Sequence, residues 1–157
     1  MFEQISNFFT IEMIYLWLNI GIIPLWLMLI FLPKSKFSSF FITSIIPYLI
    51  LGSIYIYLIY YLYSSGYSFI ENFNLYRGIE ELKILFSDQS FLIIFWVHFL
   101  AVNLFCGSWI VRDSQKYSMS RSTVFFPLIL TYFLGPIGIF FYWVIRIFFA
   151  KKISFYD

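Results

Sequence analysis

Charge is what this sequence has least of. Only 11% of its 157 residues are Asp, Glu, Lys or Arg, whereas about 25% is usual for a soluble domain. With 62% of the residues hydrophobic, a single core of this size cannot bury the apolar surface in water, and a water-soluble domain is excluded. A lipid bilayer removes the difficulty, because exposed Leu, Ile and Phe are favourable there. The composition therefore indicates an integral membrane protein, with lipid as its first partner.

Cysteine, histidine and clustered basic residues are also scarce. The single Cys106 excludes an internal disulfide and a cysteine-based zinc site. The longest basic tract is Lys151-Lys152, so we expect no binding of nucleic acid. The one histidine, His98, could hold a haem through a single axial bond, but no other residue supports a haem. We therefore expect no metal and no cofactor.

Long apolar runs, by contrast, are abundant. A membrane-spanning helix needs about 20 mostly apolar residues. Four segments reach this length: residues 10–32, 40–63, 91–111 and 123–150. We therefore predict an all-α polytopic membrane protein, a single domain over residues 1–157, with four transmembrane helices and both termini on one side of the membrane.

The stretch between the second and third predicted spans is too polar to cross a membrane. Within it, four apolar residues recur at helical spacing: Ile79, Leu82, Leu85 and Phe86. This pattern favours a short helix that lies at the membrane surface. The alternative is an ordered polar loop.

Gly135-Pro136 lies near the middle of the fourth predicted span. Proline removes a helix hydrogen bond and is expected to kink the helix there. Such a kink either opens a pocket between helices or is one of the ordinary prolines of membrane helices.

A histidine and an asparagine lie inside the third predicted span. His98 and Asn103 are five residues apart and so point about 140° apart around the helix. An ionisable residue in a membrane is a candidate functional residue, and the alternative for each side chain is a hydrogen bond to a neighbouring helix. We expect His98 to face the protein interior.

Charged and aromatic residues near the helix ends have two interpretations. Arg112-Asp113 and Arg146 are expected to anchor their helices at the interface or to extend their charged groups into water. The large aromatic residues either pack in an interfacial belt or line a site for a flat, elongated apolar ligand.

The run at residues 96–113, WVHFLAVNLFCGSWIVRD, resembles the signature of the neoxanthin-synthase-like (abscisic-acid-deficient-four-like) membrane proteins of plants, algae and cyanobacteria. In that family a pattern close to W-x-H-F-L-A-x-D-L-F-x-G-R-W-I is followed by an acidic residue. Residues 23–36, IPLWLMLIFLPKSK, and 133–146, FLGPIGIFFYWVIR, are similar to the family's first and last helices.

The resemblance implies a protein that acts on carotenoids or xanthophylls, a hydrophobic polyene ligand. Plant members are associated with the conversion of violaxanthin to neoxanthin, which opens a 5,6-epoxide and forms an allene with loss of a proton next to the ring. This isomerisation needs an acid at the epoxide oxygen and a base at the carbon, and no redox cofactor. His98 and Asp113 match the family pattern and are the candidate catalytic residues. The candidate ligand-binding residues are Asn103, Trp109, Phe105, Trp26 and Tyr55.

Two departures from the pattern leave the question of catalysis open. Asn103 stands where the family has Asp, and Ser108 stands where it has Arg. An amide cannot exchange a proton as a carboxylate does. The alternatives to a cofactor-independent isomerase are a non-catalytic pigment-binding or membrane-complex assembly subunit and a small transporter. The resemblance implies a thylakoid, plastid or bacterial inner membrane, and an oligomer or pigment–protein complex as the assembly.

Overall fold

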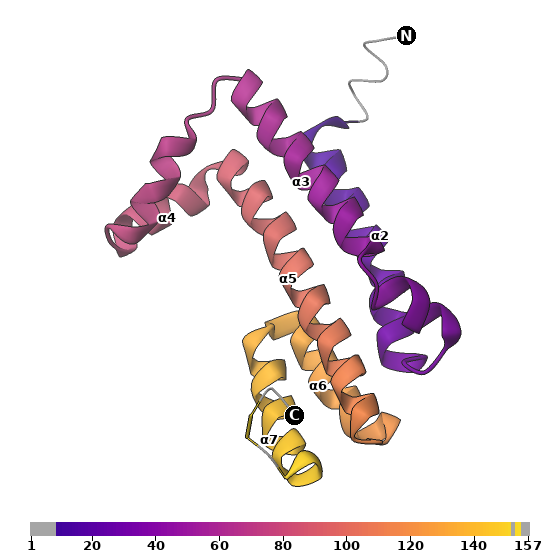
Figure 1. The fold of residues 1–157 in the computed structure, drawn as a ribbon. Coiled ribbons are helices and arrows are strands. Elements are labelled where there is room, and N and C mark those ends of the chain that lie inside the picture. Colours follow the sequence, from indigo (N-terminus) through magenta and orange to yellow (C-terminus); the bar gives the residue numbers. More distant parts are fainter. Residues whose placement is uncertain (1–8, 152, 155–157) are drawn as a thin grey trace. The chain divides into compact units, whose positions relative to one another are not determined.

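The computed structural model describes residues 9–151, 153 and 154, and every regular element in that part of the chain is helical. The elements follow one another as α2 (Ile11–Phe31), the π-helix η2 (Ser38–Ile42), α3 (Ile46–Ser64), the 3-10 helix η3 (Phe69–Tyr76), α4 (Ile79–Ser87), α5 (Gln89–Lys116), α6 (Arg121–Leu134) and α7 (Pro136–Ala150), as Figure 1 shows. The chain forms two compact units. The first runs up to Ile20 and includes Tyr48–Ala101, and the second contains Gly21–Pro47 and the chain from Val102 onward. The all-α prediction is confirmed.

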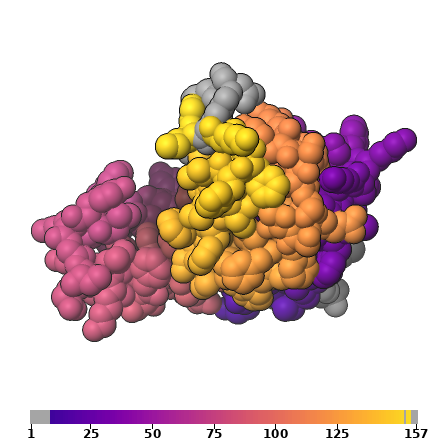
Figure 2. All heavy atoms as spheres, turned by 90° about the horizontal axis from the view of Figure 1, so that it is seen from below, coloured from indigo at the N-terminus to yellow at the C-terminus, as the bar shows by residue number. Residues whose placement is uncertain are grey.

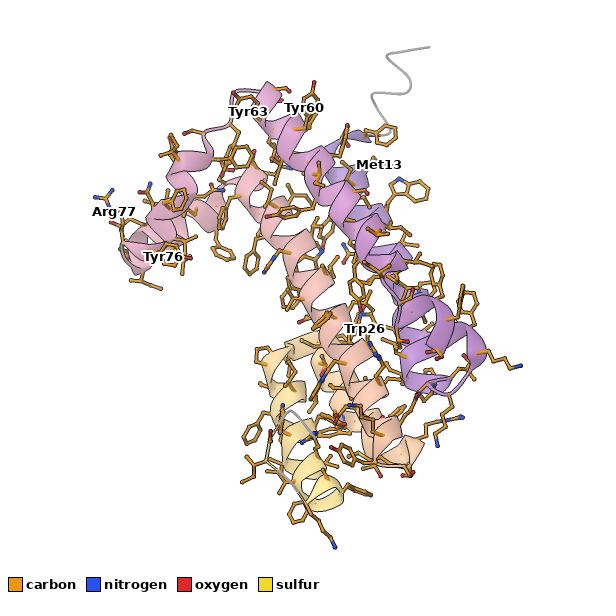
Figure 3. The ribbon with its side chains drawn as sticks, viewed as in Figure 1. Met13, Trp26, Tyr60, Tyr63, Tyr76 and Arg77 are labelled. Carbon is orange, nitrogen blue, oxygen red and sulfur yellow. The ribbon has the colours of Figure 1, made fainter. Side chains whose placement is uncertain are left out.

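In the described part of the chain, three helices are long and apolar enough to cross a membrane: α2, α3 and α5, with 21, 19 and 28 residues. At 1.5 Å per residue even α3 is about 28 Å long, close to the roughly 30 Å of a bilayer's hydrocarbon core. The first and third predicted spans correspond to α2 and α5. The second begins later than predicted, at Ile46, because the π-helix η2 and a turn precede it. Tyr60 and Tyr63 lie at the C-terminal end of α3 in Figure 3.

The fourth predicted span is wrong as a single helix. Residues 123–150 lie in two helices, α6 of 14 residues and α7 of 15, which only Gly135 separates. Gly135 has a φ of 51°, a left-handed conformation that ends α6. Pro136 then begins α7, at a position where its missing N–H is not needed. The two helices are about 21 and 22 Å long, so each is too short to cross about 30 Å of hydrocarbon.

Helices α6 and α7 fold back on each other as an antiparallel hairpin (Figure 1). Gly138 lies against Thr131, and the ring of Phe141 is 5.8 Å from that of Phe126, so later positions in α7 meet earlier positions in α6. A Cβ atom at Gly138 would overlap the backbone nitrogen of Thr131, so glycine permits this close approach. Figure 2 shows the orange and yellow segments that include α6 and α7 packed directly against each other.

Helices α2 and α5 run in the same direction. In the first unit Glu12 of α2 is hydrogen-bonded to Gln89 at the start of α5. In the second unit Gln115, near the end of α5, donates a hydrogen bond of 2.9 Å to the carbonyl of Pro33, just beyond α2. The N-terminal ends are therefore paired within one unit and the C-terminal ends within the other.

The polar connection between α3 and α5 contains η3 and α4, which pack against each other. The short helix predicted from the apolar spacing is confirmed as α4, and its position at a membrane surface stays a prediction. Leu85 of α4 is buried, whereas Ile79 and Ile84 are exposed. Tyr76 and Arg77 project from this segment in Figure 3.

Candidate functional site

The most polar part of the second unit is a buried group of side chains between α5 and α7. Oδ2 of Asp113 accepts two hydrogen bonds of 2.7 Å, one from the hydroxyl of Tyr142 and one from Nε of Arg146. The two charged residues are almost fully enclosed, with exposed fractions of 5% for Asp113 and 1% for Arg146. Buried charges are tolerated when they are paired and hydrogen-bonded, and this geometry meets both conditions.

The rest of the Arg146 guanidinium is also held. Nη2 donates to the hydroxyl of Tyr117 at 3.0 Å, and Nη1 donates to the carbonyl of Ser154 at 3.2 Å. The guanidinium lies over the rings of Tyr117 and Trp143, with its carbon 5.0 and 4.8 Å from the ring centres. Cation–π contacts of this kind are stronger where water is excluded. Arg146 is therefore held from three sides.

The prediction that these residues anchor helix ends at the interface is wrong for Asp113 and Arg146. Both side chains turn inward, because each is the counter-charge of the other. The sequence reasoning also missed Tyr142 and Tyr117 as members of the group. Helical spacing could have found them, since Tyr142 lies four residues before Arg146 and Tyr117 four residues after Asp113.

Asn103 lies at the turn of the α6–α7 hairpin. Its Oδ1 atom would be 2.8 Å from a Cβ atom built on Gly135, so the amide fills the space that glycine leaves there. Asn103 is 6% exposed, and its Nδ2 atom has no hydrogen-bond partner among the residues that the structure describes. The structure therefore places the predicted residue inside the protein, with an unsatisfied donor.

The other candidate ligand-binding residues of the second unit divide into two groups. Trp26 is buried, touches the position of Gly107 and lies 5.3 Å from the ring of Tyr132. Trp109 is half-buried and packs on the rings of Tyr142 and Trp143. Phe105 is 60% exposed. Trp26 and Trp109 are therefore packing residues of the hairpin, and Phe105 faces outward.

His98 and Tyr55 belong to the first unit. His98 is exposed on α5, so the expectation that it faces the protein interior is wrong. Tyr55 is half-buried on α3. These two candidates therefore belong to a different unit from Asp113 and Asn103.

The first unit contains a cavity of about 410 Å³ between the N-terminal parts of α2 and α5. The sequence reasoning did not find this site. At its edge Nε2 of Gln89 donates a hydrogen bond of 2.8 Å to Oε1 of Glu12. Trp96 forms part of the wall and lies 5.8 Å from the ring of Tyr15.

Metal binding has no visible support in the described part of the chain. No three His, Cys, Asp or Glu side chains converge there on a point where an ion could sit. Cys106 is a free, half-buried thiol.

Comparison with known proteins finds a matching family and a related protein. A family model described as ABA4-like (ABA DEFICIENT 4-like) matches residues 13–142. This range includes residues 23–36 and 96–113, so the resemblance inferred from those segments is confirmed. The chain is also similar to "Protein ABA DEFICIENT 4, chloroplastic" of Arabidopsis thaliana, with 26% identity over 123 residues. That alignment covers 69% of this chain and 53% of the relative, so the chain spans about half of the relative's length. No solved structure matches the chain.

Proposed function

Because the chain belongs to the ABA4-like family, we propose that it acts on carotenoids or xanthophylls in a plastid membrane as a cofactor-independent isomerase. Family membership is the observation that carries this function. The three long apolar helices support a membrane location, and the relative's name supports a plastid. Nothing in the comparisons supports the bacterial inner membrane as an alternative.

The proposed reaction moves protons and electron pairs within one molecule. A base removes the proton from the polyene carbon next to the epoxide-bearing ring, and the C–H electron pair becomes part of a new double bond. The epoxide C–O bond at the ring carbon breaks, and the oxygen keeps its electrons and takes up a proton. The product is an isomer, so the step needs an acid and a base but no oxidant.

Asp113 and Tyr142 are the acid–base pair that we propose for this step. The 2.7 Å hydrogen bond between the phenol and Oδ2 of the carboxylate is a path for a proton, and Arg146 balances the negative charge. All hydrogen bonds of Asp113 to described residues end on Oδ2. We propose that Oδ1 takes the proton from the polyene carbon.

His98 has a separate place in this proposal. His98 and Asp113 are fifteen positions apart on α5, a rise of about 22 Å along an α-helix, so the two cannot act on one ring. His98 is exposed on α5 in the first unit. We propose that its side chain contacts the polyene from the lipid side.

The test is conversion in a host that accumulates violaxanthin, with pigments separated by chromatography. Tyr142→Phe keeps the ring and removes the proton donor, so we expect conversion to fall about 100-fold or more. Conversion by Asp113→Asn should fall by the same factor, and conversion by His98→Gln should fall less. Asp88→Asn, at the exposed start of α5, is the matched control and should convert fully. Full conversion by a folded Tyr142→Phe protein would remove this pair from the chemistry.

One observation favours a second function, pigment binding without turnover. Position 103 carries an amide where the family pattern has a carboxylate, and its buried Nδ2 atom lacks a partner in the described structure. An amide can bind an oxygen atom of a xanthophyll but cannot remove a proton. Pigment that copurifies with the protein and is recovered unchanged would establish this function instead.

A further inference from the structure

A cavity lies between the N-terminal parts of α2 and α5, and we propose that it binds one oxygenated end ring of a xanthophyll. Its volume is about 410 Å³. The lining residues all belong to the first unit: Ile11, Glu12, Tyr15, Gln89, Leu92, Ile93 and Trp96. We rest this inference on the function proposed above, because the class of ligand comes from it.

The size and the walls of the cavity fit a ring. Ligand pockets usually measure about 300 to 1,000 Å³ and are mostly apolar with a few polar groups. This cavity is at the small end of that range, which suits a methylated six-membered ring better than a whole polyene. Leu92 and Ile93 supply apolar walls from α5, and the rings of Tyr15 and Trp96 are 5.8 Å apart.

The polar groups around the cavity suit a hydroxyl. Glu12 and Gln89 lie side by side, joined by the 2.8 Å hydrogen bond, and present carboxylate and amide oxygens that accept from an O–H. Trp96 instead supplies a hydrogen-bond donor. Its Nε1–H is buried and has no hydrogen-bond partner among the described residues. An unpaired buried N–H is unfavourable, and an oxygen atom of a bound ligand would satisfy it after a small movement of the ring. A hydroxyl both donates and accepts, so it can use both sides of the site.

A purely hydrocarbon occupant would leave these groups unused. An alkyl chain or an unsubstituted ring fills the cavity but offers no acceptor to Trp96 and no donor to Glu12. The cavity therefore distinguishes oxygenated carotenoids from carotenes. A xanthophyll has two end rings, and this cavity takes one of them.

The test compares zeaxanthin with β-carotene, which share the polyene and both rings and differ in the ring hydroxyls. The full chain is placed in phosphatidylcholine nanodiscs, and each pigment is titrated while its induced circular dichroism is recorded in the visible range. The signal of the same pigment in empty nanodiscs is subtracted, so that what remains comes from pigment held in the chiral site of the protein. We expect zeaxanthin to bind about tenfold more tightly than β-carotene, as one or two hydrogen bonds provide.

Two variants locate the binding. Trp96→Phe keeps an aromatic wall and removes the N–H, so zeaxanthin should bind about five- to tenfold more weakly while β-carotene is unchanged. Ile11→Trp fills the cavity and should weaken both pigments. Leu16→Trp is its control, because Leu16 is exposed on the same helix and does not line the cavity. Thermal unfolding shows whether each variant is folded. If Ile11→Trp does not fold, the result for Trp96→Phe alone decides whether the cavity is the binding site.

Equal affinity for the two pigments, or zeaxanthin binding that Trp96→Phe leaves unchanged, overturns this site. The same preparation is tested for violaxanthin conversion. If the protein converts or binds pigment but Trp96 does not affect the preference for zeaxanthin over β-carotene, the proposed function stands and only the assignment of the cavity is wrong. Absence of any pigment binding or conversion by the wild-type chain overturns the function, and the cavity assignment with it.

Discussion

Asp113 and Arg146 show how two opposite charges can be buried in so apolar a chain. They form an ion pair of 2.7 Å, the hydroxyl of Tyr142 donates a hydrogen bond to Asp113, and Arg146 donates one to the hydroxyl of Tyr117. Removing one member of a buried pair leaves an uncompensated charge, which costs more than the pair itself contributes.

A double-mutant cycle tests this arrangement. We expect Arg146→Met alone to lower the free energy of unfolding by about 3–5 kcal/mol, because Asp113 is then buried without its cation. Asp113→Leu combined with Arg146→Met should restore most of that loss, since no charge remains. The measurement is thermal unfolding in one detergent at one ionic strength. Additive losses in the double variant would show that the two charges do not depend on each other.

For single residues, the sequence shows which are polar but does not predict where their side chains point. Asp113 and Arg146 are 33 residues apart, and no local pattern tells whether each turns to water or to the other. His98 and Asn103 were correctly expected to lie in different directions on one helix. Which of the two faces inward depends on the neighbouring helices, and Asn103 is the buried one.

Among the elements, the α6–α7 hairpin differs most from expectation. The apolar run from 123 to 150 is continuous, and hydropathy records apolar length but not a reversal of direction. Gly135-Pro136 was interpreted as a kink, whereas the positive φ of Gly135 turns the chain back completely. Helices α2 and α5 were predicted well, because polar residues end both of their apolar runs.

The hairpin depends on Gly138, and a methyl group there tests it. A Cβ atom at this position would overlap the backbone nitrogen and Oγ1 of Thr131 and lie 2.6 Å from the carbonyl oxygen of Pro127. Backbone atoms cannot move aside as a side chain does, so Gly138→Ala should cost about 1–3 kcal/mol or more. Gly21→Ala is the control, because nothing lies within 4 Å of that position, and it should gain about 0.5–1 kcal/mol of helix stability. Equal stability of the two variants would argue against close packing of α6 on α7.

For the whole molecule, the hairpin changes the expected topology. We predict three spans and a hairpin that enters and leaves on one side, which would put Thr10 and Ser154 on opposite sides of the membrane, whereas four spans would put them on the same side. In a Cys106→Ser background, we expect Thr10→Cys and Ser154→Cys to be labelled by an impermeant maleimide from opposite faces of sealed vesicles. Labelling of both from one face would mean that residues 121–150 cross the bilayer.

The pairing of Asp113 with Arg146 also dictates an order of assembly during synthesis. The ribosome completes α5 well before it reaches Arg146, so for a time Asp113 lacks the partner with which it is paired in the folded protein. We expect that end of α5 to stay at the translocon or at the water boundary until α7 has been made. We therefore expect α7 to complete the insertion of α5. A chain that ends before Arg146 should be degraded by membrane quality-control proteases.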